Sequence, residues 1–189
     1  MTRRFDSLLL DASCLLNLFA TGRLREIADV LPYQLYVAGY VAEREALYVR
    51  RAGPADAEEV RIPVDLSPLI EKGLIQLMWL ENPTEETTFV NLAAHLDDGE
   101  AITGALAFHR SCLVATDDRK ARRVLGQLNP PVKLVATLQL LKMWAKEAAV
   151  PKDELRKAMA NMQSGASYIP GSRDPLHNWW RSIVSGPDT

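Results

Sequence analysis

The chain has 189 residues, of which 48% are hydrophobic and 24% charged, and its formal net charge is −2. These values are typical of a globular protein and exclude disordered and fibrous classes. No apolar run approaches the ~20 residues that a membrane span requires, and the first apolar stretch, which ends at Asp11, is too short for a signal peptide. We therefore expect a cytoplasmic protein that does not contact a membrane, in which Cys14 and Cys112 are buried, reduced thiols.

Short apolar runs alternate with helical periodicities along the chain. The expected order is a strand at 7–10, helices at 14–20 (capped by Ser13) and 24–31, a strand at 34–37, a helix at 39–51, an irregular or strand-like connection at 62–67, a short helix at 68–73, a strand at 74–80, helices at 84–96 and 97–108, a strand at 112–115, a basic helix at 119–126, a strand at 132–136, and helices at 137–144 and 151–162. From residue 163 onward no period is sustained, and we expect an extended tail.

This alternation predicts an α/β fold with a central parallel sheet and helices on both faces. We expect one domain over 1–148, with 149–189 forming a C-terminal helix and an extended tail packed on or near it. In such a sheet the strand ends share one edge, where open α/β sheets bind their ligands. Asp11 and the pair Asp117 and Asp118 each follow a buried strand directly, so topology alone brings these carboxylates to the same edge.

Two further acidic clusters fall near expected helix starts, at Glu43 and Glu45 and in the run from Asp97 to Glu100. Carboxylates that lie close together raise one another's pKa, and a divalent cation removes that repulsion. Oxygen ligands suit Mg²⁺ or Mn²⁺, whose bound water serves phosphodiester hydrolysis. The clusters therefore indicate metal-assisted cleavage of a phosphate ester.

Each cluster also has a plainer interpretation. An Asp after a strand is commonly a cap or a turn residue, and Glu43 and Glu45 could be solvated charges paired with Arg44 or Arg50. The acidic run ending in Glu100 could be a helix cap with favourable charges in its first turn. The net charge gives no global attraction to nucleic acid, and the basic helix at 119–126 is either a solvated face or a phosphate-contacting strip.

Four segments, taken in order, resemble the four acidic motifs of the PIN domain. They are Leu8-Leu9-Leu10-Asp11-Ala12-Ser13, Val41-Ala42-Glu43-Arg44-Glu45, Asp98-Gly99-Glu100-Ala101 and Ala115-Thr116-Asp117-Asp118-Arg119-Lys120. The last two are similar to those of small prokaryotic, VapC-like ribonucleases, which have a Gly-Glu third motif and an Asp-Asp-Arg-Lys fourth motif. The resemblance runs from Asp11 to about Trp144.

The resemblance implies a three-layer α/β/α fold and Mg²⁺- or Mn²⁺-dependent ribonuclease activity, often as the toxin of a toxin–antitoxin pair. It assigns the catalytic acids to Asp11, Glu43, Glu100 and Asp118, and Asp117 supports Asp118 as a metal ligand. Supporting roles fall to the hydroxyl residues Ser13 and Thr116, and Glu45 is an alternative second acid. The partners are an RNA substrate and, in a toxin, an antitoxin protein; a homodimer is left open.

A second class of function stays open beside the enzyme: a catalytically degenerate PIN-like module that binds or regulates. A third, a doubly wound nucleotide binder, is disfavoured because no Gly-rich phosphate loop follows any expected strand. The three histidines are scattered without the spacing of a zinc site or a catalytic triad. The pair Trp179 and Trp180 could stack on bases, although packing is the favoured role.

Overall fold

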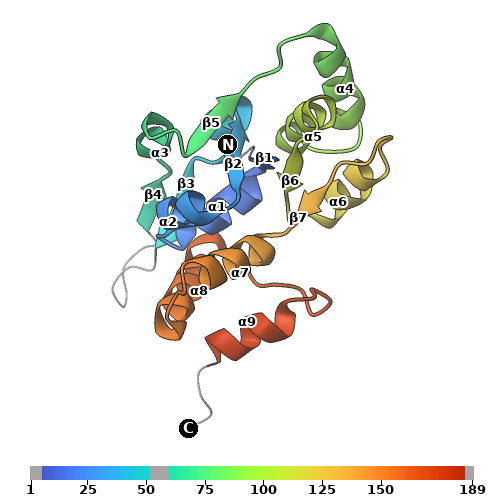
Figure 1. Cartoon of the computed structure of the whole chain (residues 1–189). Helices are drawn as coiled ribbons and strands as arrows, with labels where there is room; N and C mark the ends of the chain where they lie inside the picture. The colour runs from blue at the N-terminus through green and yellow to red at the C-terminus, as the bar shows by residue number, and fades with distance from the viewer. Residues whose placement is uncertain (1–5, 52–59, 186–189) are drawn as a thin grey trace, which may run out of the picture. The chain divides into compact units, whose positions relative to one another are not determined.

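The computed structural model describes residues 6–51 and 60–185, and the chain divides into two compact units. The first unit comprises Met1–Leu15, Pro32–Leu47 and Asp65–Ala136, and it contains the whole of the main sheet (Figure 1). The second comprises Leu16–Leu31, Tyr48–Val64 and Thr137–Thr189. The predicted α/β/α fold class with a central parallel sheet is confirmed, while the predicted domain boundary at residue 148 stays a prediction.

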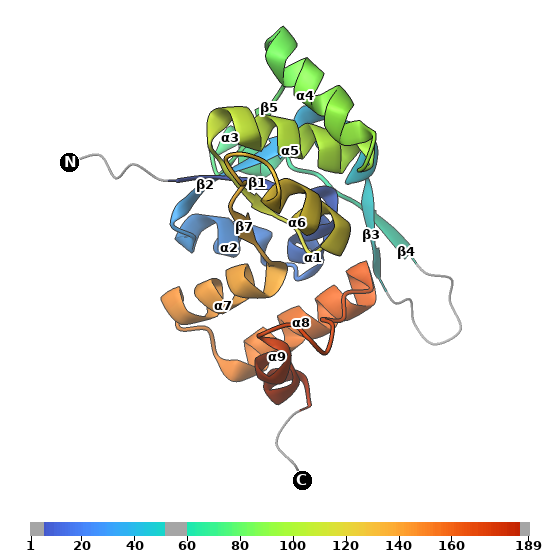
Figure 2. The same cartoon turned by 90° about the vertical axis from the view of Figure 1, so that its right-hand side faces the viewer.

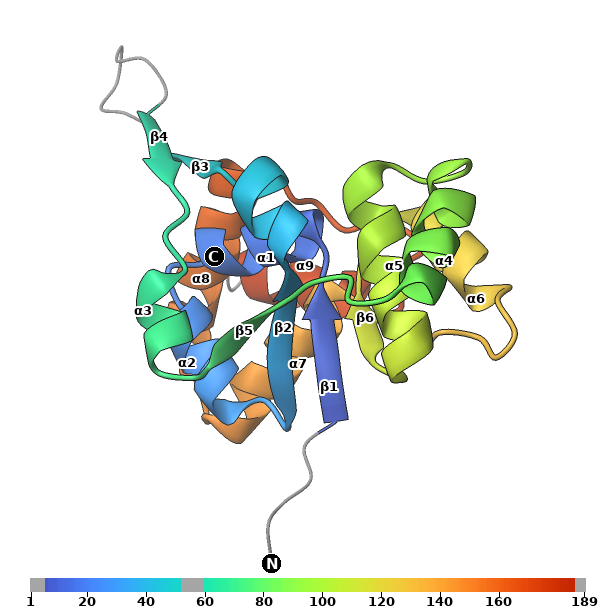
Figure 3. The ribbon, with the colours of Figure 1, turned by 90° about the horizontal axis from the view of Figure 1, so that it is seen from above.

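The first unit is built on a five-stranded sheet in the order β5-β2-β1-β6-β7, with every neighbouring pair parallel. Its elements are β1 (Asp6–Leu10), the start of α1 (Ala12–Ala20), β2 (Tyr33–Ala38), the π-helical turn η1 (Val41–Glu45), α3 (Ser67–Glu71), β5 (Ile75–Met78), α4 (Pro83–Ala93), α5 (Asp98–Arg110), β6 (Leu113–Ala115), α6 (Arg119–Gly126) and β7 (Leu134–Val135). Seen from above, β5, β2, β1 and β6 lie side by side (Figure 3).

The central strand β1 anchors the core of this unit. Its residues Leu8, Leu9 and Leu10 are fully buried, and burying each leucine contributes roughly 1.5–3 kcal/mol. Helix α5 packs against β1, β2 and β6, with its neighbour α4 alongside (Figure 1). Because β1 is held on both edges by parallel partners, the residue that follows it has a fixed position.

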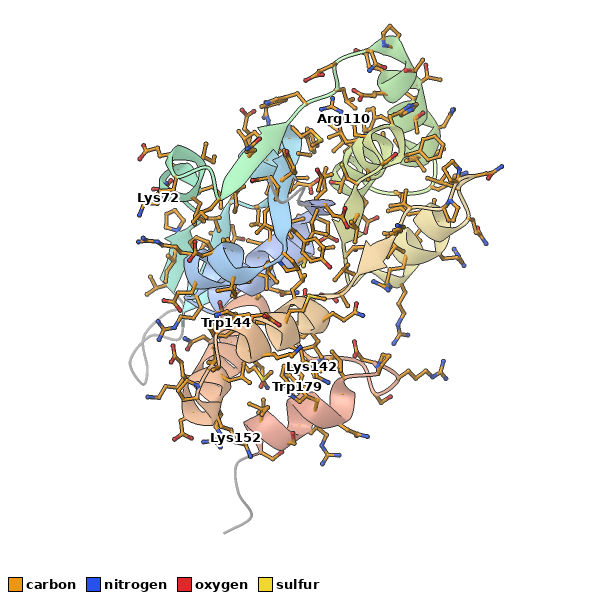
Figure 4. The ribbon with its side chains drawn as sticks, in the orientation of Figure 1. Lys72, Arg110, Lys142, Trp144, Lys152 and Trp179 are labelled. Atoms are coloured by element: carbon orange, nitrogen blue, oxygen red, sulfur yellow. The ribbon has the colours of Figure 1, made fainter. Side chains whose placement is uncertain are left out.

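The second unit is mostly helical. It contains most of α1, and also α2 (Leu24–Val30), the antiparallel pair β3 (Tyr48–Arg51) and β4 (Val60–Pro63), α7 (Thr137–Glu147), α8 (Lys152–Ala166) and α9 (His177–Val184). Helix α8 packs on α9, as Figure 2 shows, and Arg156 of α8 donates from Nε to the carbonyl of Ile183 at 2.9 Å. The Lys142 ammonium lies 5.8 Å from the ring centre of Trp179 (Figure 4).

Three local predictions are wrong. The helix expected at 39–51 is reduced to η1, because Tyr48 and Val49 instead pair with Pro63 and Ile62 in a ladder that suits aromatic and β-branched side chains. The cap of α1 is Asp11 rather than Ser13, since the Cys14 N–H donates to Asp11 Oδ1 at 2.6 Å. The segment expected to be an extended tail contains α9, whose amphipathic period is short.

In the part of the chain that the structure describes, no helix combines the length and the apolar character needed to cross a membrane.

Candidate active site

Asp11 follows β1 directly and is 4% exposed. Its backbone N–H donates to the Ala115 carbonyl at 3.1 Å, which extends the pairing of β1 with β6 by one residue. The carboxylate accepts from the Cys14 N–H at 2.6 Å and from Ser13 Oγ at 3.0 and 3.1 Å, and Thr116 also bonds it. The sheet and the first turn of α1 therefore fix this carboxylate in place.

The end of β6 contributes the second set of acids. Thr116 is 1% exposed, and its Oγ1 accepts from the Asp118 N–H at 3.1 Å while its side chain bonds Asp11. Asp117 is half-buried, and its charge raises the pKa of Asp11. Asp118 is exposed and caps α6 by accepting from the N–H groups of Lys120 and Ala121 at 2.7 and 2.8 Å. The juxtaposition that topology predicts for Asp11 and these aspartates is thus present.

Helix α5 supplies the third acid, Glu100, in its first turn. Asp97 caps this helix, with Oδ1 accepting from the Glu100 N–H at 2.8 Å, so the plainer interpretation of Asp97 is also correct. The pKa of Glu100 is raised to about 7, first by burial and then by the charges of Asp97, Asp118 and Asp11, in that order. The Glu100 carboxylate is therefore repelled by carboxylates that follow two strands, β1 and β6, and by the aspartate that caps its own helix.

The two candidates in η1 have different surroundings. Glu43 is exposed to solvent. Glu45 is half-buried and accepts a hydrogen bond from the backbone N–H of Gly99, at the start of α5. Burial raises the pKa of Glu45, and so do the charges of Asp97 and Asp98. Of the two, Glu45 is the one whose carboxylate meets the acidic start of α5.

Sequence reasoning gave no role to Gly99 or Tyr40. A Cβ at Gly99 would overlap the Glu45 carboxylate, so a side chain there would displace Glu45. The signal that could have found it is a glycine inside an acidic first helical turn, where close approach of another group is a standard reason for glycine. Tyr40 donates from its hydroxyl to Asp98 Oδ2 at 3.4 Å, and its position just before η1 gave no cue.

Burial dominates the chemistry of Asp11 as well. Removal from water raises the pKa of Asp11 to about 6, against the hydrogen bonds from Thr116, Cys14 and Ser13, which lower it. Ionisation of Asp11 and of Glu100 is therefore opposed by desolvation and by repulsion from neighbouring carboxylates. A bound cation would relieve both penalties.

A sheet edge that collects carboxylates defines a class of site suited to hard cations and phosphate groups. The family model DUF3368, described as a PIN domain, matches residues 7–173, and the chain belongs to the PIN domain family. No curated protein and no solved structure matches the chain. PIN domains are in general nucleases, so a nuclease-type hydrolase function follows at that level.

PIN nucleases typically use divalent metals, and the donor chemistry here suits them. The candidate ligands Asp11, Glu100, Asp117 and Asp118 present carboxylate oxygens only, which favours Mg²⁺ or Mn²⁺. Among residues 6–51 and 60–185, no three His, Cys, Asp or Glu side chains are arranged to hold a metal ion together. Mg²⁺ commonly keeps several waters and takes only one or two carboxylates, so a pair of these acids with water fits it.

Proposed function

We propose that this protein is a Mg²⁺- or Mn²⁺-dependent ribonuclease that hydrolyses phosphodiester bonds of RNA. The observation that carries the proposal is the electrostatic environment of Glu100, whose pKa is raised to about 7 by burial and by acids from the ends of β1 and β6 as well as its own cap. This concentration of negative charge is unfavourable unless a bound cation compensates it. Membership of the PIN family makes a phosphodiester the expected target.

In the proposed reaction a pair of carboxylates from the set Asp11, Glu100, Asp117 and Asp118 would hold the metal, and water would complete its coordination. The metal, when bound, supplies an acidified water and positive charge beside the scissile phosphate. Ser13, Thr116 and the Cys14 N–H keep the Asp11 carboxylate in one orientation. Preorganisation of this kind avoids reorientation of the ligands during the reaction.

We assign the second acid to Glu45 rather than Glu43. The Gly99 N–H and the charges of Asp97 and Asp98 tie Glu45 to the start of α5, where Glu100 also lies, whereas Glu43 faces solvent. The two residues form a matched pair for mutation: Glu45→Gln should lower the cleavage rate by at least tenfold, and Glu43→Gln should leave it within twofold. The reverse result would return the assignment to Glu43.

The test of the ribonuclease function is cleavage of a labelled RNA by the purified chain with Mn²⁺, compared with the Asp11→Asn variant. Cleavage should require the metal and should be lost in the variant while its circular dichroism stays unchanged. Undiminished cleavage by Asp11→Asn would refute the assignment. Folded wild-type protein that neither cleaves RNA nor binds Mn²⁺ would instead favour the alternative, a catalytically degenerate module that binds or regulates.

The narrower role of a toxin rests on the likeness of the third and fourth acidic motifs to VapC-like ribonucleases. A toxin would have an antitoxin protein as partner, and it could act as a homodimer. Expression in a bacterial host should then arrest growth, and the Asp11→Asn variant should not. Normal growth at high expression of active enzyme would contradict this role.

A further inference from the structure

An exposed tryptophan lies at the same sheet edge as the acids. Trp79 follows Met78, the last residue of β5, and 45% of it is exposed. Tryptophan is highly buried on average, and this exposed indole lies at the sheet edge that carries the candidate acids. The strand β5 is two places from β1 in the sheet (Figure 3), and two strand spacings amount to about 10 Å.

The ring of Trp79 rests against the backbone of Gly39. A Cβ built on Gly39 would overlap three carbons of the six-membered ring of the indole, so only glycine leaves room for it there. Gly39 follows β2, the strand between β5 and β1. One side of the indole is therefore supported by the sheet edge while almost half of the residue stays accessible to solvent.

The backbone of Trp79 is held by the partly buried ion pair of Arg110 and Glu85. Arg110, labelled in Figure 4 at the end of α5, donates from Nη2 to the Trp79 carbonyl at 2.6 Å. The same guanidinium binds Glu85 in a bidentate manner, at 2.8 Å through Nε and 3.0 Å through Nη2. Glu85, whose side chain is 3% exposed, also accepts from the Glu81 N–H at 2.8 Å.

A buried ion pair is a weak source of net stability, because desolvation offsets much of the attraction between the charges. Here the pair has a specific structural result: it fixes the segment from Trp79 to Glu81 at two backbone groups. The exposed tryptophan is thus held at its backbone by Arg110 and at its ring by Gly39. Such immobilisation lowers the entropy lost when a ligand binds.

Hydrogen bonding and charge connect the surroundings of Trp79 to acidic residues near the start of α5. Tyr40 directly follows Gly39, and its hydroxyl donates to Asp98 at the start of α5. Burial raises the pKa of Tyr40, and so do the charges of Asp98 and Glu45. Gly39 and Tyr40 therefore link Trp79 to Asp98 at the start of α5, two residues before Glu100, and to the charge of Glu45.

We propose that Trp79 is a stacking platform for an unpaired base of the RNA substrate. The proposal rests on the ribonuclease function proposed above. Bases stack on aromatic side chains whatever their identity, and only unpaired bases expose a face for this. The short path from Trp79 to the acids places the stacked base within a few nucleotides of the scissile phosphate.

The test measures binding of a labelled single-stranded RNA of mixed sequence to the full chain in EDTA, so that cleavage does not interfere. Trp79→Ala should raise Kd by about 5- to 150-fold, the range expected for loss of one stacked base. Trp79→Phe should retain most of the wild-type affinity, because phenylalanine keeps an aromatic face. The slope of log Kd against log salt should not change, since no phosphate contact is removed.

Two controls belong to the same experiment. Trp179→Ala removes another partly exposed indole, which lies near Lys142 in the second unit, and should leave Kd within twofold. Gly39→Ala keeps the Trp79 ring but displaces it, and should weaken binding as Trp79→Ala does. Thermal unfolding of each variant verifies that the fold is intact.

Equal affinity of wild type and Trp79→Ala, or equal affinity for a duplex of the same sequence, would overturn the proposal. A change in oligomeric state or in binding of a protein partner, with RNA affinity unchanged, would also overturn it and identify Trp79 as a protein contact. Failure of the ribonuclease function shows separately, as absence of Mn²⁺-dependent cleavage by the wild type. Cleavage that persists while Trp79→Ala binds normally leaves the enzyme assignment standing and removes only the platform.

Discussion

Replacing Asp11 by Asn should stabilise the metal-free protein at neutral pH while it abolishes cleavage. The carboxyl is 4% exposed and burial raises its pKa to about 6 from an ordinary value of 3.8. At about 1.4 kcal/mol per pKa unit, ionised Asp11 destabilises the folded state by about 3 kcal/mol. Asn carries no charge but loses acceptor capacity toward Ser13 and Thr116, which offsets about 1–2 kcal/mol.

The net gain of about 1–2 kcal/mol corresponds to a rise in Tm of about 2–8 °C for a chain of this size. It should depend on pH with a definite sign. Because the folded pKa of Asp11 is raised, the folded state binds the proton more tightly, and wild-type stability falls as pH rises from about 4 to about 6. The advantage of Asp11→Asn should therefore be absent below about pH 4 and complete above about pH 7.

Thermal unfolding in EDTA at pH 4, 6 and 8 measures this pH dependence of the stability difference. The matched control is Asp29→Asn, which replaces an exposed carboxylate on α2. Addition of Mn²⁺ at pH 8 should raise the Tm of the wild type more than that of Asp11→Asn, because the cation compensates the charge of the buried, ionised carboxylate. An Asp11→Asn variant that is less stable than the wild type at pH 8 would refute the reasoning about burial. An identical Mn²⁺ shift in both proteins would remove Asp11 from the ligands.

Two further substitutions test the supports of the site. Gly99→Ala should displace the Glu45 carboxylate and lower the cleavage rate by at least tenfold with little change in Tm, and normal cleavage by this variant would contradict the role of Glu45. Glu85→Gln should cost about 2–3 kcal/mol in urea unfolding because the Arg110 charge loses its buried partner, whereas Glu86→Gln in the same helical turn should cost under about 0.5 kcal/mol. Hydrogen bonds from Arg110 lower the pKa of Glu85 below its ordinary value of 4.5. The stabilisation by ionised Glu85 is therefore complete above about pH 4.5, and the difference in stability between Glu85→Gln and wild type should shrink as pH falls below that value.

The main sheet could be predicted from the sequence because its strands are short, continuous apolar runs between helical segments. Leu8, Leu9 and Leu10 are fully buried on both faces, and that environment is what an unbroken apolar run indicates. The segment at 39–51 could not be predicted, because its apolar spacing suits a helix equally well. What decides the strand β3 is pairing with β4, a contact with distant residues that local spacing does not contain.

The site divides in the same way. Asp11 and Asp118 could be paired from topology, since parallel strands that are neighbours must end at the same edge. The choice between Glu43 and Glu45 could not be made, because a two-residue difference within one turn of helix changes which side chain reaches α5. Trp79 lies in the apolar run that predicts a strand at 74–80, but β5 ends at Met78, and the indole that rests against Gly39 is 45% exposed.

Asp11 combines two influences of opposite sign, and their balance suits a metal ligand. The first turn of α1 and two hydroxyl residues favour its ionised form, while burial opposes it more strongly, which leaves the pKa near 6. At neutral pH the carboxylate is therefore ionised but destabilised. A solvated aspartate with an ordinary pKa would release less free energy on meeting a cation, because it would have no desolvation penalty to relieve. The strain that lowers the stability of the metal-free fold thus strengthens the response of this position to metal.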